Sequence, residues 1–174
     1  MNRIVILGTG HATVTRCYNT CFVLQTDTTT LLVDAGGGNG ILQRLKQAGI
    51  AIKDLHHMYV THAHTDHILG TIWVIRMVLS AAGYEGRFHV YSHAKVLRVI
   101  SMICGETLSA KHRRLMGERV VMHEVGDGTG FNVGDIGMQS FDIHSKKEPQ
   151  YGFRATLPGG AVVVCLGDEP YNPL

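Results

Sequence analysis

The sequence has few cysteines and no long apolar run, and each absence excludes a class of protein. The four cysteines are widely spread, and no second close pair follows the first at the spacing of a zinc ribbon. We therefore expect free thiols and a reducing, cytoplasmic location. No stretch reaches the roughly 18 to 20 apolar residues of a membrane span. The first apolar run stops at Gly8, too early for a signal peptide.

Charge is also sparse. The formal net charge is +2, which is too small to indicate nucleic-acid binding by itself. Apolar residues make up 45% of the chain and charged residues 17%, as in ordinary globular proteins. A chain of 174 residues can bury a proper core, so we predict one domain over residues 1–174.

The most informative segment is residues 62–67, which has the pattern H-x-H-x-D-H. Neutral imidazole and carboxylate are ligands that suit zinc, iron or manganese. His62 and His64 are two apart, so in an extended segment both point to one side. Asp66 and His67 are adjacent, so they aim elsewhere and could serve a second ion. The pattern predicts a two-metal site that activates water; the alternative is a polar loop that is rich in histidine by chance.

Periodicity predicts strands and helices in an order typical of layered sheets with helices outside. Strands are expected at 4–7, 21–26, 29–33, 55–60, 87–91, 119–125, 134–142, 153–157 and 161–166. Helices are expected at 41–48, 68–82, 108–116, and from an N-cap at Ser92 to about Cys104. The metal motif would then lie on a strand-to-helix turn, where loops place functional groups on a rigid scaffold.

The H-x-H-x-D-H motif resembles that of the metallo-β-lactamase superfamily. Three other segments fit the family's order: 31–37 as a strand ending in D-x-G, 141–145 with His144, and 165–168 with Asp168. Segments 6–10 and 151–154 resemble the ribonuclease Z-like branch. The resemblance covers essentially the whole chain. It implies an α/β fold, the αββα sandwich, with metals at the edge where loops of both sheets meet.

The resemblance also implies a role for each matching residue. His62, His64 and His144 would hold one ion, Asp66 and His67 the second, and Asp168 would bridge both. A hydroxide between the ions would be the nucleophile, with Asp66 as a catalytic residue that orients it. We expect two divalent ions, with zinc favoured and manganese or iron open. Asp34 is expected to orient a metal-binding histidine rather than to bind metal, or else to serve as a turn residue.

Two departures from the family pattern bear on function. No histidine follows His144, and the chain ends at Leu174, six residues after Asp168. We therefore expect an incomplete C-terminal part, with apolar faces that favour a homo-oligomer. The interval from His144 to Asp168 is only 168 − 144 = 24 residues, which leaves no room for the tRNA-gripping arm of ribonuclease Z.

These observations predict a metal-dependent hydrolase, a phosphodiesterase acting on a small cyclic or nucleotide substrate rather than on structured tRNA. Two alternatives stay open. One is an ester, thioester or sulfate-ester hydrolase on the same fold, since fold alone does not name a substrate. The other is an inactive fragment that binds metal poorly.

Overall fold

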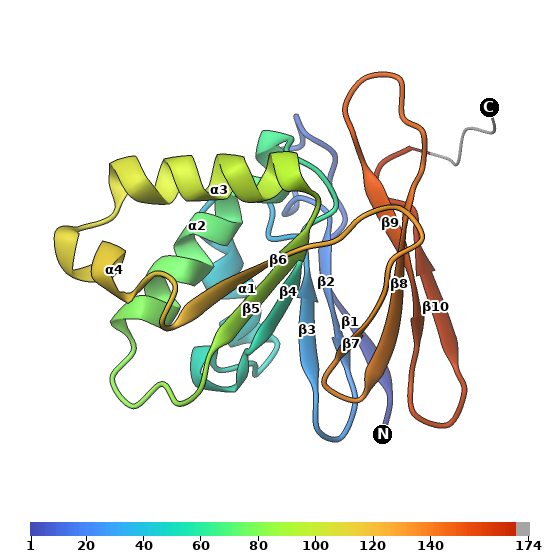
Figure 1. Ribbon diagram of the computed structural model, residues 1–174, viewed down its shortest axis with the longest axis horizontal. Helices are drawn as coiled ribbons and strands as arrows, with labels where there is room; N and C mark the ends of the chain where they lie inside the picture. Colours follow the sequence, from blue (N-terminus) through green and yellow to red (C-terminus); the bar gives the residue numbers. More distant parts are fainter. Residues whose placement is uncertain (170–174) are drawn as a thin grey trace.

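A computed structural model describes residues 1–169. Four α-helices cover one face of a six-stranded sheet, and a four-stranded sheet packs against its other face (Figure 1). These are three of the four layers of the expected αββα sandwich. The expectation about the chain end at Leu174 lies outside the described residues.

The six-stranded sheet has the order β1-β2-β3-β4-β5-β6, with antiparallel pairs at its start and parallel pairs from β3 onward. Its strands are β1 (Arg3–Gly8), β2 (Cys21–Gln25), β3 (Thr30–Val33), β4 (His57–Tyr59), β5 (Phe88–Ser92) and β6 (Val120–Glu124). Because neighbouring parallel strands end at the same edge, the loops after β3 and β4 lie together. Those loops contain Asp34 and the start of the metal motif.

The second sheet is antiparallel throughout, in the order β10-β9-β8-β7. Its strands are β7 (Gly130–Val133), β8 (Ile136–Asp142), β9 (Tyr151–Thr156) and β10 (Val162–Cys165). At the start of β9, the backbone N–H of Tyr151 donates to the carbonyl of Thr61, which joins the two sheets at this edge. Because β10 runs antiparallel to β9, the turn after β10 brings Asp168 to the same edge.

The helices are α1 (Gly40–Gln47), α2 (Thr65–Ser80), α3 (Ala94–Thr107) and α4 (Ala110–Leu115), with a short 3₁₀ helix η1 (Ile52–Asp54). α2 is largely apolar and buries nine of its residues, so it packs as a core helix beneath the site. No helix of the described residues is long and apolar enough to cross a membrane.

Two apolar clusters hold the layers together. One, between the helices and the first sheet, includes Met58, Ile75 and Val90. The other lies between the sheets, where Tyr59 and Phe153 meet edge to face with ring centroids 5.0 Å apart. A fully buried side chain of this kind contributes about 1.5–3 kcal/mol to folding, so the two clusters fix the edge from which the metal motif projects.

Several expected boundaries were wrong. Ser92 does not cap α3: it is the last residue of β5, its hydroxyl donates to the carbonyl of Val60, and His93 occupies the cap position. α2 begins at Thr65 rather than at 68 and ends at Ser80 rather than at 82. The strand β7 and the helix η1 were not expected. β7 has four residues, of which one is glycine and one is asparagine, so only its pairing with β8 makes it a strand.

Candidate metal centre

The metal motif begins after β4 and enters the first turn of α2. His62 is fully buried, and His64 is an exposed, extended residue immediately before the helix. The two rings meet nearly at right angles, and His62 Nε2 lies 2.9 Å from His64 Nδ1. Asp66 and His67 are buried in the first helical turn, not in the turn that precedes it. The helix start therefore places His67 beside His62, with ring centroids 4.1 Å apart.

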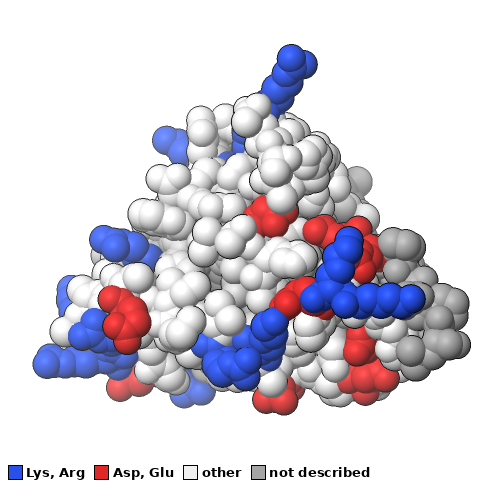
Figure 2. All heavy atoms as spheres, turned by 90° about the horizontal axis from the view of Figure 1, so that it is seen from above, with Lys and Arg blue, Asp and Glu red and all other residues white. Residues whose placement is uncertain are grey.

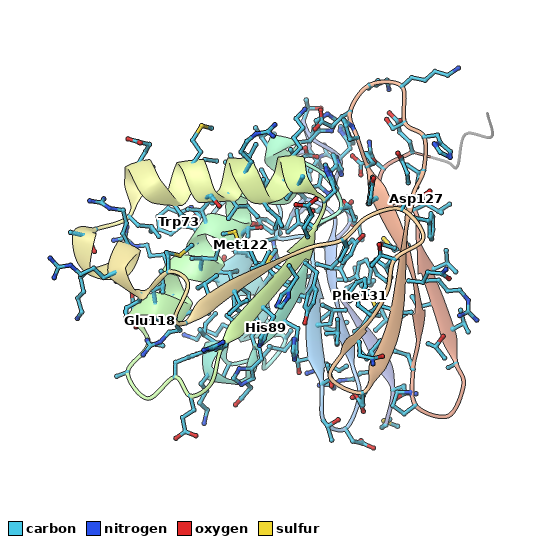
Figure 3. All side chains as sticks on the ribbon, in the orientation of Figure 1. Trp73, His89, Glu118, Met122, Asp127 and Phe131 are labelled. Atoms are coloured by element: carbon cyan, nitrogen blue, oxygen red, sulfur yellow. The ribbon has the colours of Figure 1, made fainter. Side chains whose placement is uncertain are left out.

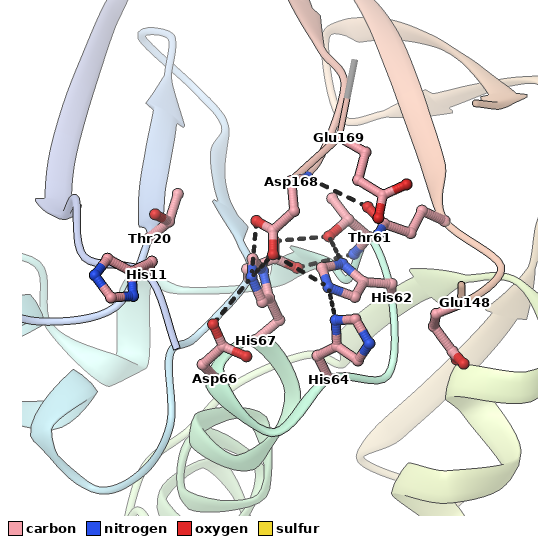
Figure 4. A network of polar contacts seen from close by, with 12 residues as sticks. His11, Thr20, Thr61, His62, His64, Asp66, His67, Glu148, Asp168 and Glu169 are labelled. Atoms are coloured by element: carbon pink, nitrogen blue, oxygen red, sulfur yellow. Dashed lines mark hydrogen bonds and ion pairs between the residues drawn. The ribbon is translucent and has the colours of Figure 1, made fainter. Parts of the chain in front are cut away.

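Asp168 joins the two pairs. The ligand atoms of His62, His64 and Asp168 lie within 4.8 Å of one another, and so do those of Asp66, His67 and Asp168. Asp168 Oδ2 is 3.6 Å from His62 Nε2, and Asp168 Oδ1 is 3.0 Å from His67 Nε2 (Figure 4). This is the arrangement required of a carboxylate that bridges two ions. We call these five residues the candidate metal centre.

Asp34 lies beneath the centre and orients two of its imidazoles. Its buried carboxylate accepts hydrogen bonds from His67 Nδ1 (2.7 Å), from the Thr61 backbone N–H (2.8 Å) and from the Thr61 hydroxyl (2.8 Å). Because the Thr61 hydroxyl donates to Asp34, it accepts from His62 Nδ1, 2.9 Å away. Both histidines then carry a proton on Nδ1, so Nε2 is the nitrogen that each turns toward the centre as a potential ligand. This geometry fits the expectation that Asp34 orients ligands.

The electrostatics of the centre favour a cation. Burial, and then the neighbouring His67, lower the pKa of His62 to about 4, so its imidazole is neutral at pH 7 and can bind metal. Burial also acts to lower the pKa of His67, but Asp34 and Asp168 outweigh it and raise that pKa to about 10. The hydrogen bond from His67 lowers the pKa of Asp168. A positive charge is therefore held between the carboxylates, where a metal ion would displace the proton.

A glycine lets α2 approach this support closely. Gly70 N–H donates to the carbonyl of Gly36 at 2.8 Å, and Ala35 N–H donates to the carbonyl of His67 at 3.0 Å. A Cβ placed on Gly70 would lie 1.8 Å from the carbonyl oxygen of Ala35. Only glycine fits this position, so Gly70 sets the distance between α2 and the loop that contains Asp34.

Two features of the site differ from the sequence prediction or were missed by it: His144 was expected to share the first ion with His62 and His64, and Gln150 was not expected at all. His144 follows β8 with a left-handed backbone (φ 58°), and neither of the two ligand groups contains it. Gln150 is buried, and its side-chain oxygen accepts from the backbone N–H of Asp168 at 3.2 Å, which positions Asp168. Nothing local in the sequence marks Gln150 for this role. Thr61, by contrast, directly precedes the motif.

Fold and site together define a ribonuclease Z-like protein of the metallo-β-lactamase superfamily. Human tRNase Z, short form, is similar with a TM-score of 0.72 and 18% identity over 97% of this chain and 69% of that one. The metallo-β-lactamase fold protein YhfI from Bacillus subtilis is similar with a TM-score of 0.74 and 18% identity over 99% and 65%.

The ribonuclease Z of Mycolicibacterium gilvum (strain PYR-GCK) is 26% identical over 187 residues, which cover 100% of this chain but only 64% of that protein. The chain therefore spans less than two thirds of this relative. The model of the family described as "Anti-Pycsar protein Apyc1" matches residues 2–164. The chain belongs to this family.

Proposed function

We propose that residues 1–174 form a single domain that acts as a metal-dependent hydrolase, a phosphodiesterase that uses water activated between two metal ions. The proposal rests mainly on one observation: Asp168 belongs to both ligand groups. The proposed ligands are His62, His64 and His144 for one ion, Asp66 and His67 for the other, and Asp168 for both. His144 would have to reach the first ion from the loop after β8.

The donor set fits divalent transition metals. Two imidazole nitrogens 2.9 Å apart need only a small opening to share one tetrahedral ion. Four imidazoles and two carboxylates suit zinc first, and also manganese or iron. When bound, two such ions would supply the activation of water and the neutralisation of charge that phosphodiester cleavage needs.

The protein's own groups have separable roles in this proposal. Asp66 would act as the catalytic residue that orients the attacking water, because its carboxylate lies 3.6 Å from His67 Nε2 within the centre. Asp34 and Thr61 would hold the imidazole tautomers and take no part in the reaction itself.

The surface favours a small cyclic or nucleotide phosphodiester over structured tRNA. β9, β10 and their connecting turn occupy most of the interval from His144 to Asp168, so no arm extends from it. Figure 2 looks down on the edge that contains the site. Lys and Arg are interspersed there with Asp and Glu rather than gathered in one positive patch. Proteins that bind an extended nucleic acid do so through a continuous positive patch.

The first test is metal content. We expect the His62→Ala/His67→Ala variant, which loses one ligand from each group, to hold about two fewer ions per chain than the wild type. The measurement is mass spectrometry of the metal in protein purified without added metal. An equal metal content in both proteins would refute the proposed centre.

The second test separates the reaction classes. The metal-loaded protein should hydrolyse bis(4-nitrophenyl) phosphate faster than 4-nitrophenyl acetate or sulfate, and a cyclic nucleotide faster than precursor tRNA. Asp66→Asn should lower kcat about 10²- to 10⁴-fold, whereas Asp54→Asn, an exposed aspartate on η1, should leave it unchanged. Faster turnover of the acetate or sulfate would assign an ester or sulfate-ester hydrolase, and poor metal binding with no turnover of any substrate would assign an inactive fragment.

The proposal also covers the oligomeric state of the protein and its location in the cell. Apolar side chains on the edge strands β1 and β10 are exposed, with Ile6 at 59% and Val164 at 56%. We propose that a second copy of the chain covers such surface, and a clean monomer by light scattering at micromolar concentration would contradict this. The four cysteines are free, which supports a reducing, cytoplasmic location.

A further inference from the structure

Three histidines lie together on the first sheet, away from the candidate metal centre. His57, His89 and His123 come from the adjacent parallel strands β4, β5 and β6. Side chains alternate across a strand, so all three share the face that looks toward the second sheet, as Tyr59 and Tyr91 do. Figure 3 shows His89 on β5. We call these residues the inter-sheet histidine cluster.

Two of these imidazoles face each other through their nitrogens. His89 Nδ1 lies 2.8 Å from His123 Nε2, which is close to the 2.9 Å between His62 Nε2 and His64 Nδ1 in the candidate metal centre. Nitrogens on a tetrahedral zinc ion at about 2.0–2.1 Å stand about 3.3 Å apart. An opening of about half an ångström would therefore admit an ion between His89 and His123.

His57 stands beside this pair and has an unused nitrogen. Its ring stacks on that of His89 with centroids 5.4 Å apart, and its Nδ1 is buried without a hydrogen-bond partner. Buried polar atoms are nearly always paired, so an orphan nitrogen indicates a missing ligand or water. In this structure, one ligand nitrogen from each of the three rings does not lie within 4.8 Å of the other two. A turn of the His57 ring about its Cβ–Cγ bond would be needed.

The surroundings keep the cluster neutral and rigid. Burial is the main cause that lowers the pKa of each of the three histidines, that of His57 to about 4, so their lone pairs are available at pH 7. Tyr91 stacks on His123 with centroids 4.6 Å apart, and Phe131 stacks on Tyr91 at 5.2 Å. Aromatic neighbours of this kind hold a ligand ring in place.

We propose that His89 and His123, with His57 as third ligand, bind one divalent transition-metal ion such as zinc at a site separate from the candidate metal centre. Water completes a tetrahedral shell, because His89 and His123 are only partly buried. Ligands that are all imidazole favour zinc, copper or nickel over magnesium or calcium, which prefer oxygen.

The test is zinc content after equilibrium dialysis against excess zinc. We expect the His89→Ala/His123→Ala variant to hold one ion fewer per chain than the wild type. His112→Ala, which removes a half-buried imidazole on α4, is the matched control and should hold as much zinc as the wild type. Equal zinc content in the wild type and a folded double variant would overturn the proposal. The ion lost in this variant is additional to the two lost in His62→Ala/His67→Ala, so a negative result at one site does not refute the other.

A second measurement needs no variant and decides the matter if the double variant does not fold. Nitrogen NMR of the imidazoles during a zinc titration of the wild-type protein should show metal-dependent shifts at His89 Nδ1 and His123 Nε2. Shifts confined to histidines of the candidate metal centre would overturn the proposal.

Discussion

Gly70→Ala is the sharpest test of how the candidate metal centre is built, because helix propensity and packing predict opposite signs. In a helix interior, alanine is favoured over glycine by about 1 kcal/mol. A Cβ at position 70, however, would lie 1.8 Å from the carbonyl oxygen of Ala35. That oxygen belongs to the backbone and cannot rotate away, so we expect a cost near the upper end of overpacking, about 3 kcal/mol.

The net expectation for Gly70→Ala is a loss of about 2 kcal/mol, or about 4–8 °C in Tm for a domain of this size. The assay is urea and thermal unfolding in EDTA, so that bound metal does not contribute. Gly105→Ala in α3 is the matched control: no atom lies within 4 Å of its added Cβ, and it should stabilise the protein by about 0.5–1 kcal/mol. If Gly70→Ala were as stable as the wild type, the close approach of α2 to Ala35 would be refuted.

Three further predictions follow from the support beneath the centre and from the histidine cluster. Asp34→Asn should weaken metal binding about 10- to 100-fold in a zinc competition titration, with an unchanged circular dichroism spectrum, since it removes the charge that orients His67. Thr61→Val should lower the free energy of urea unfolding by about 1 kcal/mol, because the hydroxyl that donates to Asp34 is lost; an unchanged midpoint would contradict this. Burial lowers the folded-state pKa of His57 to about 4, below its unfolded value of about 6.5. The stability linked to neutral His57 is thus complete above pH 6.5 and is lost as the pH falls toward 4. In EDTA, the wild type should lose more stability between pH 7 and 5 than His57→Asn does, and equal losses would contradict the assignment.

Local sequence was sufficient wherever the relevant residues are neighbours along the chain. The H-x-H-x-D-H pattern marks four of the five residues of the candidate metal centre within one segment. Apolar periodicity located α1 and most strands within a few residues, because burial on one face leaves a repeating signature. The D-x-G segment pointed to Asp34 as a support, and its hydrogen bonds to Thr61 and His67 agree with that expectation.

Boundaries were less certain, because tertiary contacts decide them. Serine is a favoured helix cap, yet the hydroxyl of Ser92 instead donates to the carbonyl of Val60, directly after β4. α2 starts early enough to include Asp66 and His67, since its first turn rests on the loop after β3. The residues next to each boundary do not determine where it falls.

The remaining features depend on residues far apart in sequence. Asp168 meets His67 across 101 positions, and Gln150 positions Asp168 only because β9 and β10 pair. The need for glycine at position 70 is set by a carbonyl from a different loop. His57, His89 and His123 are unremarkable singly, and only the parallel register of three strands brings them together. Patterns along a chain report which face of an element is buried; which partner lies opposite that face is decided by how the whole chain packs.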